Sequence, residues 1–256
     1  MMKTKISTSL LVVCLFVLSS CTFTTGEGPV LEKGFAKSTF QGVELDGSFN
    51  VNINQGAQQH VVVKGQENII SKLKMDVLDG ILYLSLEPGN YLNYELDVEL
   101  TMPSLESVAL SGSGDIKLGT FVGLNDLAVS LDGSGDIDSD GVLEVNGNAI
   151  IDLEGSGDID LNLKANNIEA ELDGSGDIDL KGSATTASLS LDGSGDIKAF
   201  KLEALRAEIE LEGSGSIKVY ASKNLKAILE GSGDIRYKGE PAVEAKIDGS
   251  GSIEAD

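Results

Sequence analysis

The stretch that decides the fold reads Ala187-Ser-Leu-Ser-Leu-Asp-Gly-Ser-Gly-Asp-Ile-Lys-Ala199. Its centre, Gly-Ser-Gly-Asp/Ser-Ile, occurs eight times between residues 112 and 256, and successive copies lie 18 to 22 residues apart. The first glycines of the eight copies are Gly112, Gly133, Gly155, Gly174, Gly193, Gly213, Gly231 and Gly249. A fixed period of about 20 residues is typical of architectures built by stacking repeats.

Within one repeat, apolar and polar residues alternate with a period of two, which indicates β-strands. If Leu191 and Ile197 point into a core, then Gly193 and Gly195 point inward as well, while the acidic residues and serine beside them point outward. We interpret these glycines as structural corners, where the chain bends too narrowly for a Cβ.

A small residue recurs a few positions before the motif in seven repeats, and in six of them Val, Ile or Leu follows two residues later. We expect this position to stack into an apolar column. Its members are Ala128, Ala149, Ala170, Ala187, Ala207, Ala227 and Ala245.

Each repeat fits either one coil of a parallel β-solenoid or one hairpin of an antiparallel meander. The strand before the motif is long and the strand after it is short, and such unequal arms make poor hairpins. An open meander would also leave one apolar face in water, whereas a coil hides its apolar columns. We therefore predict an all-β protein with a parallel solenoid of about 20-residue coils, spaced about 4.8 Å apart, over residues 106–256.

Residues 35–105 are patterned as strands but lack the motif. Val43 to Ile53 resembles a degenerate first repeat, and Asp79-Gly80 between two apolar runs predicts a hairpin. Glu67 to Leu73 has room for one helical turn. We expect this region to be an N-terminal β capping segment, because the open edge of a first coil invites aggregation.

The N-terminus resembles a secretion signal, with Lys3 and Lys5 ahead of a short apolar run at 10–18. Leu18-Ser-Ser-Cys21 resembles the bacterial lipobox. We therefore expect residues 1–20 to be a lipoprotein signal peptide, Cys21 to carry lipid that anchors the chain in a membrane, and residues 21–34 to form a tether. The alternative is an ordinary signal peptide followed by a free cysteine.

The chain has 41 Asp and Glu against 19 Lys and Arg, a net charge of −22, which argues against nucleic acid as a partner. Stacking predicts two acidic columns. One holds Asp115, Asp136, Asp158, Asp177, Asp196, Ser216, Asp234 and Ser252, and the other holds Asp132, Glu154, Asp173, Asp192, Glu212, Glu230 and Asp248.

Carboxylates about 4.8 Å apart repel one another, so something must relieve the repulsion. The first interpretation is that each Asp accepts hydrogen bonds from N–H groups of its own glycine corner, which needs no cofactor. The second is that calcium binds between coils. The candidate cation ligands are Asp132, Asp136, Asp158, Asp173, Asp177, Asp192, Asp196 and Asp234.

The sequence offers no catalytic constellation. His60 is the only histidine, and the only cysteine after the predicted signal peptide is Cys21, whose thiol we expect to carry lipid, so no triad or zinc site is indicated. The glycine-rich corners precede strands and not helices, so they do not predict a nucleotide site. We predict that the protein is not an enzyme.

The repeated Leu-Asp-Gly-Ser-Gly-Asp-Ile core, Phe49-Asn-Val-Asn-Ile53 and Pro103-Ser-Leu105 resemble the bacterial DUF2807 family, the head GIN domain of auto-transporter adhesins. The resemblance covers residues 35–256. It implies a right-handed β-helix-like fold in secreted or lipid-anchored proteins. The sequence ends at Asp256 without the membrane barrel of an auto-transporter, so we expect anchoring through Cys21 instead.

Together these features predict a non-enzymatic, lipid-anchored protein of the bacterial envelope, in the outer membrane, that presents an acidic solenoid surface as an adhesin. Its expected partners are glycans or host and matrix proteins. Two alternatives remain, a periplasmic structural or signalling partner and a polysaccharide lyase or hydrolase on a β-helix. We also expect an end-to-end homodimer through the last coil, near Ile247 to Ile253.

Overall fold

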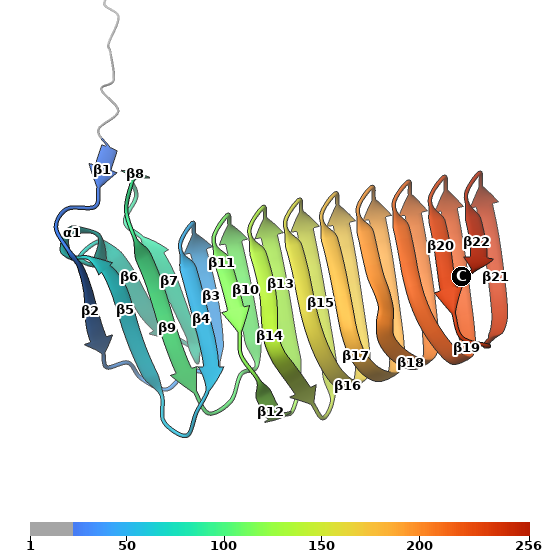
Figure 1. The fold of residues 1–256 in the computed structure, drawn as a ribbon, viewed down its shortest axis with the longest axis horizontal. Coiled ribbons are helices and arrows are strands. Elements are labelled where there is room, and N and C mark those ends of the chain that lie inside the picture. Colours follow the sequence, from blue (N-terminus) through green and yellow to red (C-terminus); the bar gives the residue numbers. More distant parts are fainter. Residues whose placement is uncertain (1–22) are drawn as a thin grey trace, which may run out of the picture.

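The computed structural model describes residues 23–256, so the predicted signal peptide and Cys21 lie outside the described residues. The described chain forms a flat rod of stacked strands (Figure 1), with the short helix α1 (Glu67–Ile70) at the N-terminal end. No helix in residues 23–256 is long and apolar enough to cross a membrane.

Each motif copy is a tight corner that joins two strands on opposite faces of the rod. We call the face built by strands before the corners the leading face, and the face built by strands after them the trailing face. The leading face begins with β3 (Gly42–Gly47), β10 (Ser107–Gly112), β13 (Leu127–Gly133) and β15 (Asn148–Gly155). The trailing face begins with β4 (Asn50–Gln55), β11 (Asp115–Leu118) and β14 (Asp136–Val145), whose second half also pairs with β12 (Phe121–Leu124).

Further along the rod, one long strand starts on the trailing face, bends at the edge opposite the corners and ends on the leading face. These strands are β16 (Asp158–Gly174), β17 (Asp177–Gly193), β18 (Asp196–Gly213) and β19 (Ser216–Gly231). The rod ends with β20 (Asp234–Lys238), β21 (Ala242–Gly249) and β22 (Ser252–Ala255).

Successive coils pair in parallel, with each motif residue opposite its equivalent in the next coil. Gly174 pairs with Gly193 and Ile178 with Ile197. The parallel register confirms the solenoid and rules out the meander. Apolar side chains at alternate positions consequently form continuous buried columns, in which Leu191 and Ile197 are almost fully buried.

The corner glycines stack on one another, and this contact explains why glycine is needed. Gly193 has a φ of +140°, and a Cβ built on it would meet the carbonyl oxygen of Gly174 in the preceding coil. Gly195 is buried, but Gly193 is only half-buried. The prediction that both glycines point into the core is therefore wrong for Gly193, whose missing side chain would point along the rod at the neighbouring backbone.

The predicted single column of alanines is wrong. Ala128 and Ala245 are exposed, whereas Ala149, Ala187 and Ala207 share one buried position that pairs with Leu225. Ala170 and Ala227 occupy a second position, two residues closer to the corner. The distance from alanine to glycine differs between repeats, so alanines fall into different columns when the corners align.

The N-terminal segment covers the first coil, as the sequence predicts. Strands β7 (Ile81–Leu86) and β9 (Leu96–Met102) stack in parallel on β3 and β4. Antiparallel strands then close the end: β6 (Leu73–Leu78) pairs with β7, β5 (His60–Gln66) with β9, and β2 (Val30–Phe35) with β5. The predicted hairpin at Asp79-Gly80 joins β6 to β7 with φ angles of 50° and 80°.

The predicted tether differs from the structure. Within residues 21–34, Phe23–Thr25 form β1, which pairs with β8 (Asn90–Leu92), and β2 begins at Val30. The N–H of Gly26 also donates to the carbonyl of Asn93. From Phe23 onward this segment is thus held against the cap by backbone hydrogen bonds.

Candidate binding surface

The trailing face carries the first predicted acidic column, and the structure confirms its register. Asp136, Asp158, Asp177 and Asp196 are direct neighbours in successive coils. The column continues through Ser216, Asp234 and Ser252. Because the strands from β14 to β22 that follow the corners hold these residues on one face, their side chains form a line along the rod.

Hydrogen bonds between coils relieve part of the repulsion in this column. Asp158 Oδ1 accepts from the N–H of Asp177 at 3.1 Å, and Asp177 Oδ1 accepts from the N–H of Asp196 at 3.2 Å. The hydroxyl of Ser216 donates to Asp196 Oδ1 at 2.7 Å. The donors lie in the next coil and not in the corner of the same coil, so the predicted donors are wrong for these aspartates.

The reason lies in the corner itself. The N–H of Ser194 donates to the carbonyl of Gly174 at 2.9 Å, and the same bond recurs at other corners, as between Ser214 and Gly193. The serine N–H groups therefore join coils through the backbone. The N–H of Asp177 is shared, because it donates both to the carbonyl of Gly157 at 3.3 Å and to Asp158 Oδ1 at 3.1 Å.

The leading face carries the second acidic column, in which Asp132, Glu154, Asp173 and Asp192 are neighbours. A groove of about 520 Å³ runs beside it and is also lined by Asp152. The candidate cation ligands are thus divided between the faces: Asp132, Asp173 and Asp192 lie on the leading face, and the other five on the trailing face. Within residues 23–256, no three acidic, histidine or cysteine side chains are grouped so that they could hold a metal ion.

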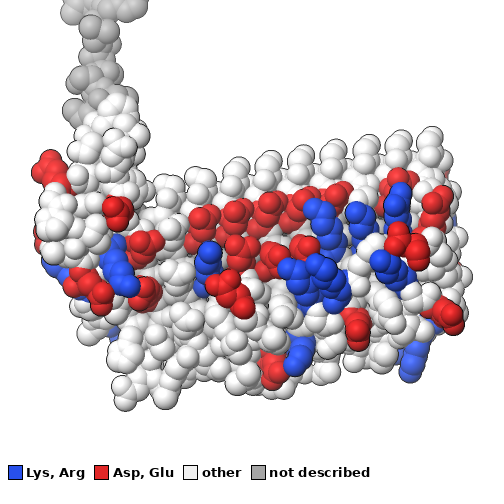
Figure 2. All heavy atoms as spheres, viewed as in Figure 1, with Lys and Arg blue, Asp and Glu red and all other residues white. Residues whose placement is uncertain are grey.

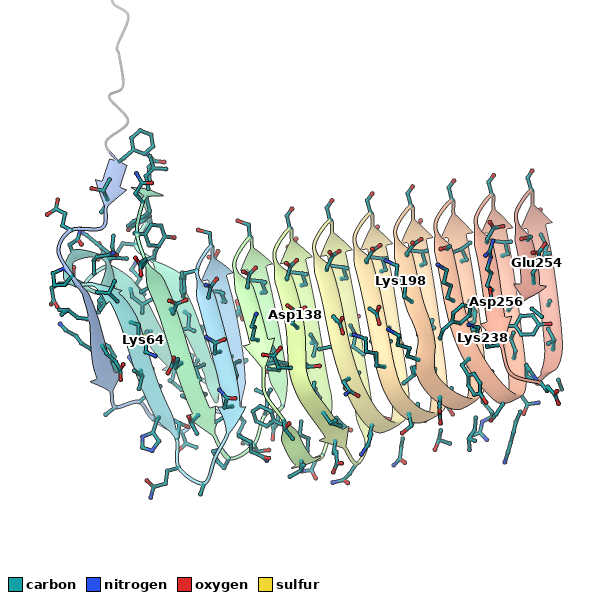
Figure 3. All side chains as sticks on the ribbon, in the orientation of Figure 1. Lys64, Asp138, Lys198, Lys238, Glu254 and Asp256 are labelled. Carbon is teal, nitrogen blue, oxygen red and sulfur yellow. The ribbon has the colours of Figure 1, made fainter. Side chains whose placement is uncertain are left out.

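Asp138 on β14 is the carboxylate most affected by this crowding (Figure 3). Burial raises its pKa above the ordinary value, and the neighbouring charges of Asp136, Asp160 and Asp140 raise it further. Lys117 in the preceding coil lowers it by a smaller amount. Burial and neighbouring negative charge together therefore disfavour the ionised form of Asp138.

Charge is not spread evenly along the rod. Residues 106–180 contain two basic residues (Lys and Arg) and seventeen acidic residues (Asp and Glu). Residues 181–256 contain ten basic and thirteen acidic residues. Figure 2 shows the result on the trailing face, where rows of acidic side chains in the middle of the rod give way to basic side chains toward the C-terminal end. On the trailing face, the acidic surface expected from the net charge is therefore strongest in the middle coils, whereas the acidic column of the leading face continues to Asp248.

A basic and aromatic patch occupies the trailing face over β18 to β20. Its residues are Lys198, Phe200, Lys218, Tyr220, Arg236 and Lys238. Lys198, Lys218 and Arg236 are direct neighbours in one column, five residues after each first glycine. The same column carries Asp138, Asp160 and Asp179 in the middle coils.

The cations of this patch differ in how far they are neutralised. Lys198 Nζ lies 2.5 Å from Asp177, and this hydrogen bond raises the pKa of Lys198. Lys238 Nζ lies 4.2 Å from the centre of the Phe200 ring and 3.1 Å from Asp256, near the C-terminal end (Figure 3). Within the described part of the chain, Lys218 and Arg236 have no ion-pair partner, so they are free to meet a ligand.

His60 opens β5 on the cap, far along the chain from the patch, and lines a shallow hollow with Phe35 and Pro103. Residues 23–256 contain no cysteine and no other histidine. Lys37, Thr39 and Gln59 are the other polar residues that line this hollow. Sequence analysis missed the basic and aromatic patch, although the change from Asp179 to Lys198 at equivalent positions was a visible signal.

Comparisons with known proteins agree with the stacked fold. The family model described as putative auto-transporter adhesin, head GIN domain (DUF2807), matches residues 39–146 and 127–241. No curated protein matches the chain.

Solved structures resemble it over nearly its whole length. A putative adhesin from Parabacteroides distasonis has a TM-score of 0.85 and 26% identity, covering 92% of this chain and 100% of that chain. A putative lipid binding protein from the same species has a TM-score of 0.84 and 27% identity, with the same coverage. A putative adhesin from Parabacteroides merdae has a TM-score of 0.84 and 26% identity, covering 91% of this chain and 99% of that chain.

Proposed function

The chain belongs to the DUF2807 family, the head GIN domain of putative auto-transporter adhesins, and on that premise we propose that it is a cell-envelope adhesin that binds glycans. The trailing face is the proposed contact surface. It is a rigid array with side chains repeated about every 4.8 Å, which favours many weak contacts with a polymer at once. No step of this function requires catalysis by the protein.

The observation that carries the proposal is the basic and aromatic patch. The ring of Tyr220 is a flat apolar surface that suits sugar rings, whereas Lys238 already lies over the ring of Phe200. Lys218 and Arg236 supply unpaired donors for hydroxyl or carboxylate groups. The acidic coils beside the patch would repel polyanions that extend across them. We therefore expect a glycan with few, spaced acidic groups and not a densely charged one.

Anchoring belongs to the same proposal. Lipid on Cys21 would hold the rod at the membrane, and multiple acyl chains give durable attachment. The adhesin family favours the cell envelope as the location, and we propose the outer membrane as the membrane that the lipid on Cys21 would enter. Protease treatment of intact cells separates a surface adhesin, which would be cleaved, from a periplasmic protein, which would be spared.

A glycan array probed with the protein tests the binding proposal. The variant with Lys218→Glu and Arg236→Glu should lose binding to the glycans that the wild-type protein selects. Lys117→Glu is the matched control, because Lys117 occupies the equivalent position in an acidic coil, and it should leave binding unchanged. Blank arrays for the wild-type protein, together with binding to matrix proteins alone, would contradict the glycan proposal.

A further inference from the structure

The last coil exposes the free edge of a strand. All eight residues of β21 are exposed, whereas the equivalent strand of the preceding coil has its inward-facing side chains buried. Val243 and Ile247 continue the buried columns of Leu225 and Leu229, yet they are 43% and 49% exposed. In the described chain, β19 covers β21 on one side, and no strand pairs with its other side.

We infer that β21 pairs antiparallel with β21 of a second copy of this chain, about a two-fold axis that passes beside Ala245. The sequence of β21 is complementary to itself in this register. Val243, Ala245 and Ile247 face the core, and Glu244 and Lys246 face outward. Antiparallel pairing about Ala245 places Glu244 opposite the partner's Lys246, and Val243 opposite the partner's Ile247.

Each of these pairs occurs twice because of the symmetry, so the interface has two Glu–Lys pairs on its outer side and two Val–Ile pairs on its inner side. Other registers are worse. An axis beside Glu244 would oppose two glutamates, and an axis beside Lys246 would oppose two lysines. Lys246 also lies 3.6 Å from Glu230 in its own chain, but its side chain is 65% exposed and remains accessible.

The trailing face contributes less to this contact. Its last strand, β22, has four residues and ends at Ala255, so the pairing rests on β21. β1, where the described chain begins, lies at the end of the rod far from β21 (Figure 1). The two N-terminal ends of the dimer therefore lie at opposite ends of a doubled rod, which suits copies held on two facing surfaces. Only this last point rests on the proposed adhesin function.

Sedimentation of residues 23–256 tests the pairing, since this segment contains the whole core from Phe40 to Ile235. The wild-type protein should form a dimer at micromolar concentration. Glu244→Lys or Lys246→Glu alone should weaken the dimer at least about tenfold, because each creates two like-charge contacts. The double variant carrying both changes should restore the dimer, because it exchanges the two charges.

Glu208→Lys is the matched control, because Glu208 occupies the same outward column two coils from the end, and it should not change the dimer. Thermal melting checks that each variant remains folded. A wild-type protein that stays monomeric up to about 100 μM would overturn the inference. A dimer that is unchanged by the single reversals would overturn the proposed register. A blank glycan array alongside a charge-dependent dimer would instead contradict only the proposed function.

Discussion

Gly195 packs against the carbonyl oxygen of Gly176 one coil earlier, so closely that a Cβ at Gly195 would overlap that oxygen. A Cβ at Gly195 would also lie 2.8 Å from Cδ2 of Leu172 in the core. The backbone and a buried side chain thus confine this position from two sides. The contact recurs at each second glycine of the motif copies and sets how closely coils can stack.

We predict that Gly195→Ala destabilises the protein by at least about 2 kcal/mol, because neither the neighbouring backbone nor the packed core can move away cheaply. Ser194→Ala, at the exposed residue between the two glycines, should change stability by no more than about 0.5 kcal/mol. Chemical denaturation followed by circular dichroism measures both. Equal effects of the two changes would show that the stacked glycine contact does not limit the fold.

The second prediction concerns Asp138. Its pKa is raised in the folded protein, first by burial and then by neighbouring carboxylates, so the folded state binds this proton more tightly than the unfolded state does. Ionised Asp138 therefore destabilises the fold when the pH is above its folded pKa, and this cost disappears as the pH falls below the ordinary Asp value.

Asp138→Asn should accordingly raise the melting temperature at pH 7 by about 1–4 °C. The difference from wild type should shrink as the solution is acidified. Asp76→Asn removes the same formal charge at an exposed position of β6 in the cap, so it should raise the melting temperature less. A lower melting temperature for Asp138→Asn at pH 7 would mean that its carboxylate makes a favourable contact that outweighs its burial.

The third prediction concerns cations. Aspartates of the trailing column accept hydrogen bonds from the next coil, and residues 23–256 contain no grouped set of acidic ligands for a metal. Calcium and magnesium should therefore act on the acidic coils by screening, and they should raise the melting temperature equally at matched ionic strength. A clearly larger shift with calcium, reversed by a chelator, would instead support specific calcium sites between coils.

Stacking itself was predictable because it depends on the motif, and the motif occupies the same place in every coil. The hairpin at Asp79-Gly80 was predictable for a similar reason, since two residues decide its geometry. The alanine column was not, because successive motifs lie 18 to 22 residues apart and the extra residues shift positions far from the corner. The donors to Asp158 and Asp177 belong to the next coil, and a single repeat does not show which N–H groups of that coil come within reach.

The last prediction separates backbone conformation from packing. Gly80 and Gly34 both have open space where a Cβ would be added, but only Gly80 has a positive φ, of 80°. Alanine at Gly80 should therefore cost about 1–2 kcal/mol through the left-handed backbone of the turn between β6 and β7.

Gly34→Ala, on β2, should instead be neutral or slightly stabilising, because it lowers the entropy of the unfolded chain without straining the folded one. Equilibrium unfolding of both variants measures the difference. If Gly80→Ala costs no more than Gly34→Ala, the turn must relax to a conformation that alanine adopts freely. In that event the pairing of β6 with β7, which closes the leading face of the cap, would not depend on the glycine.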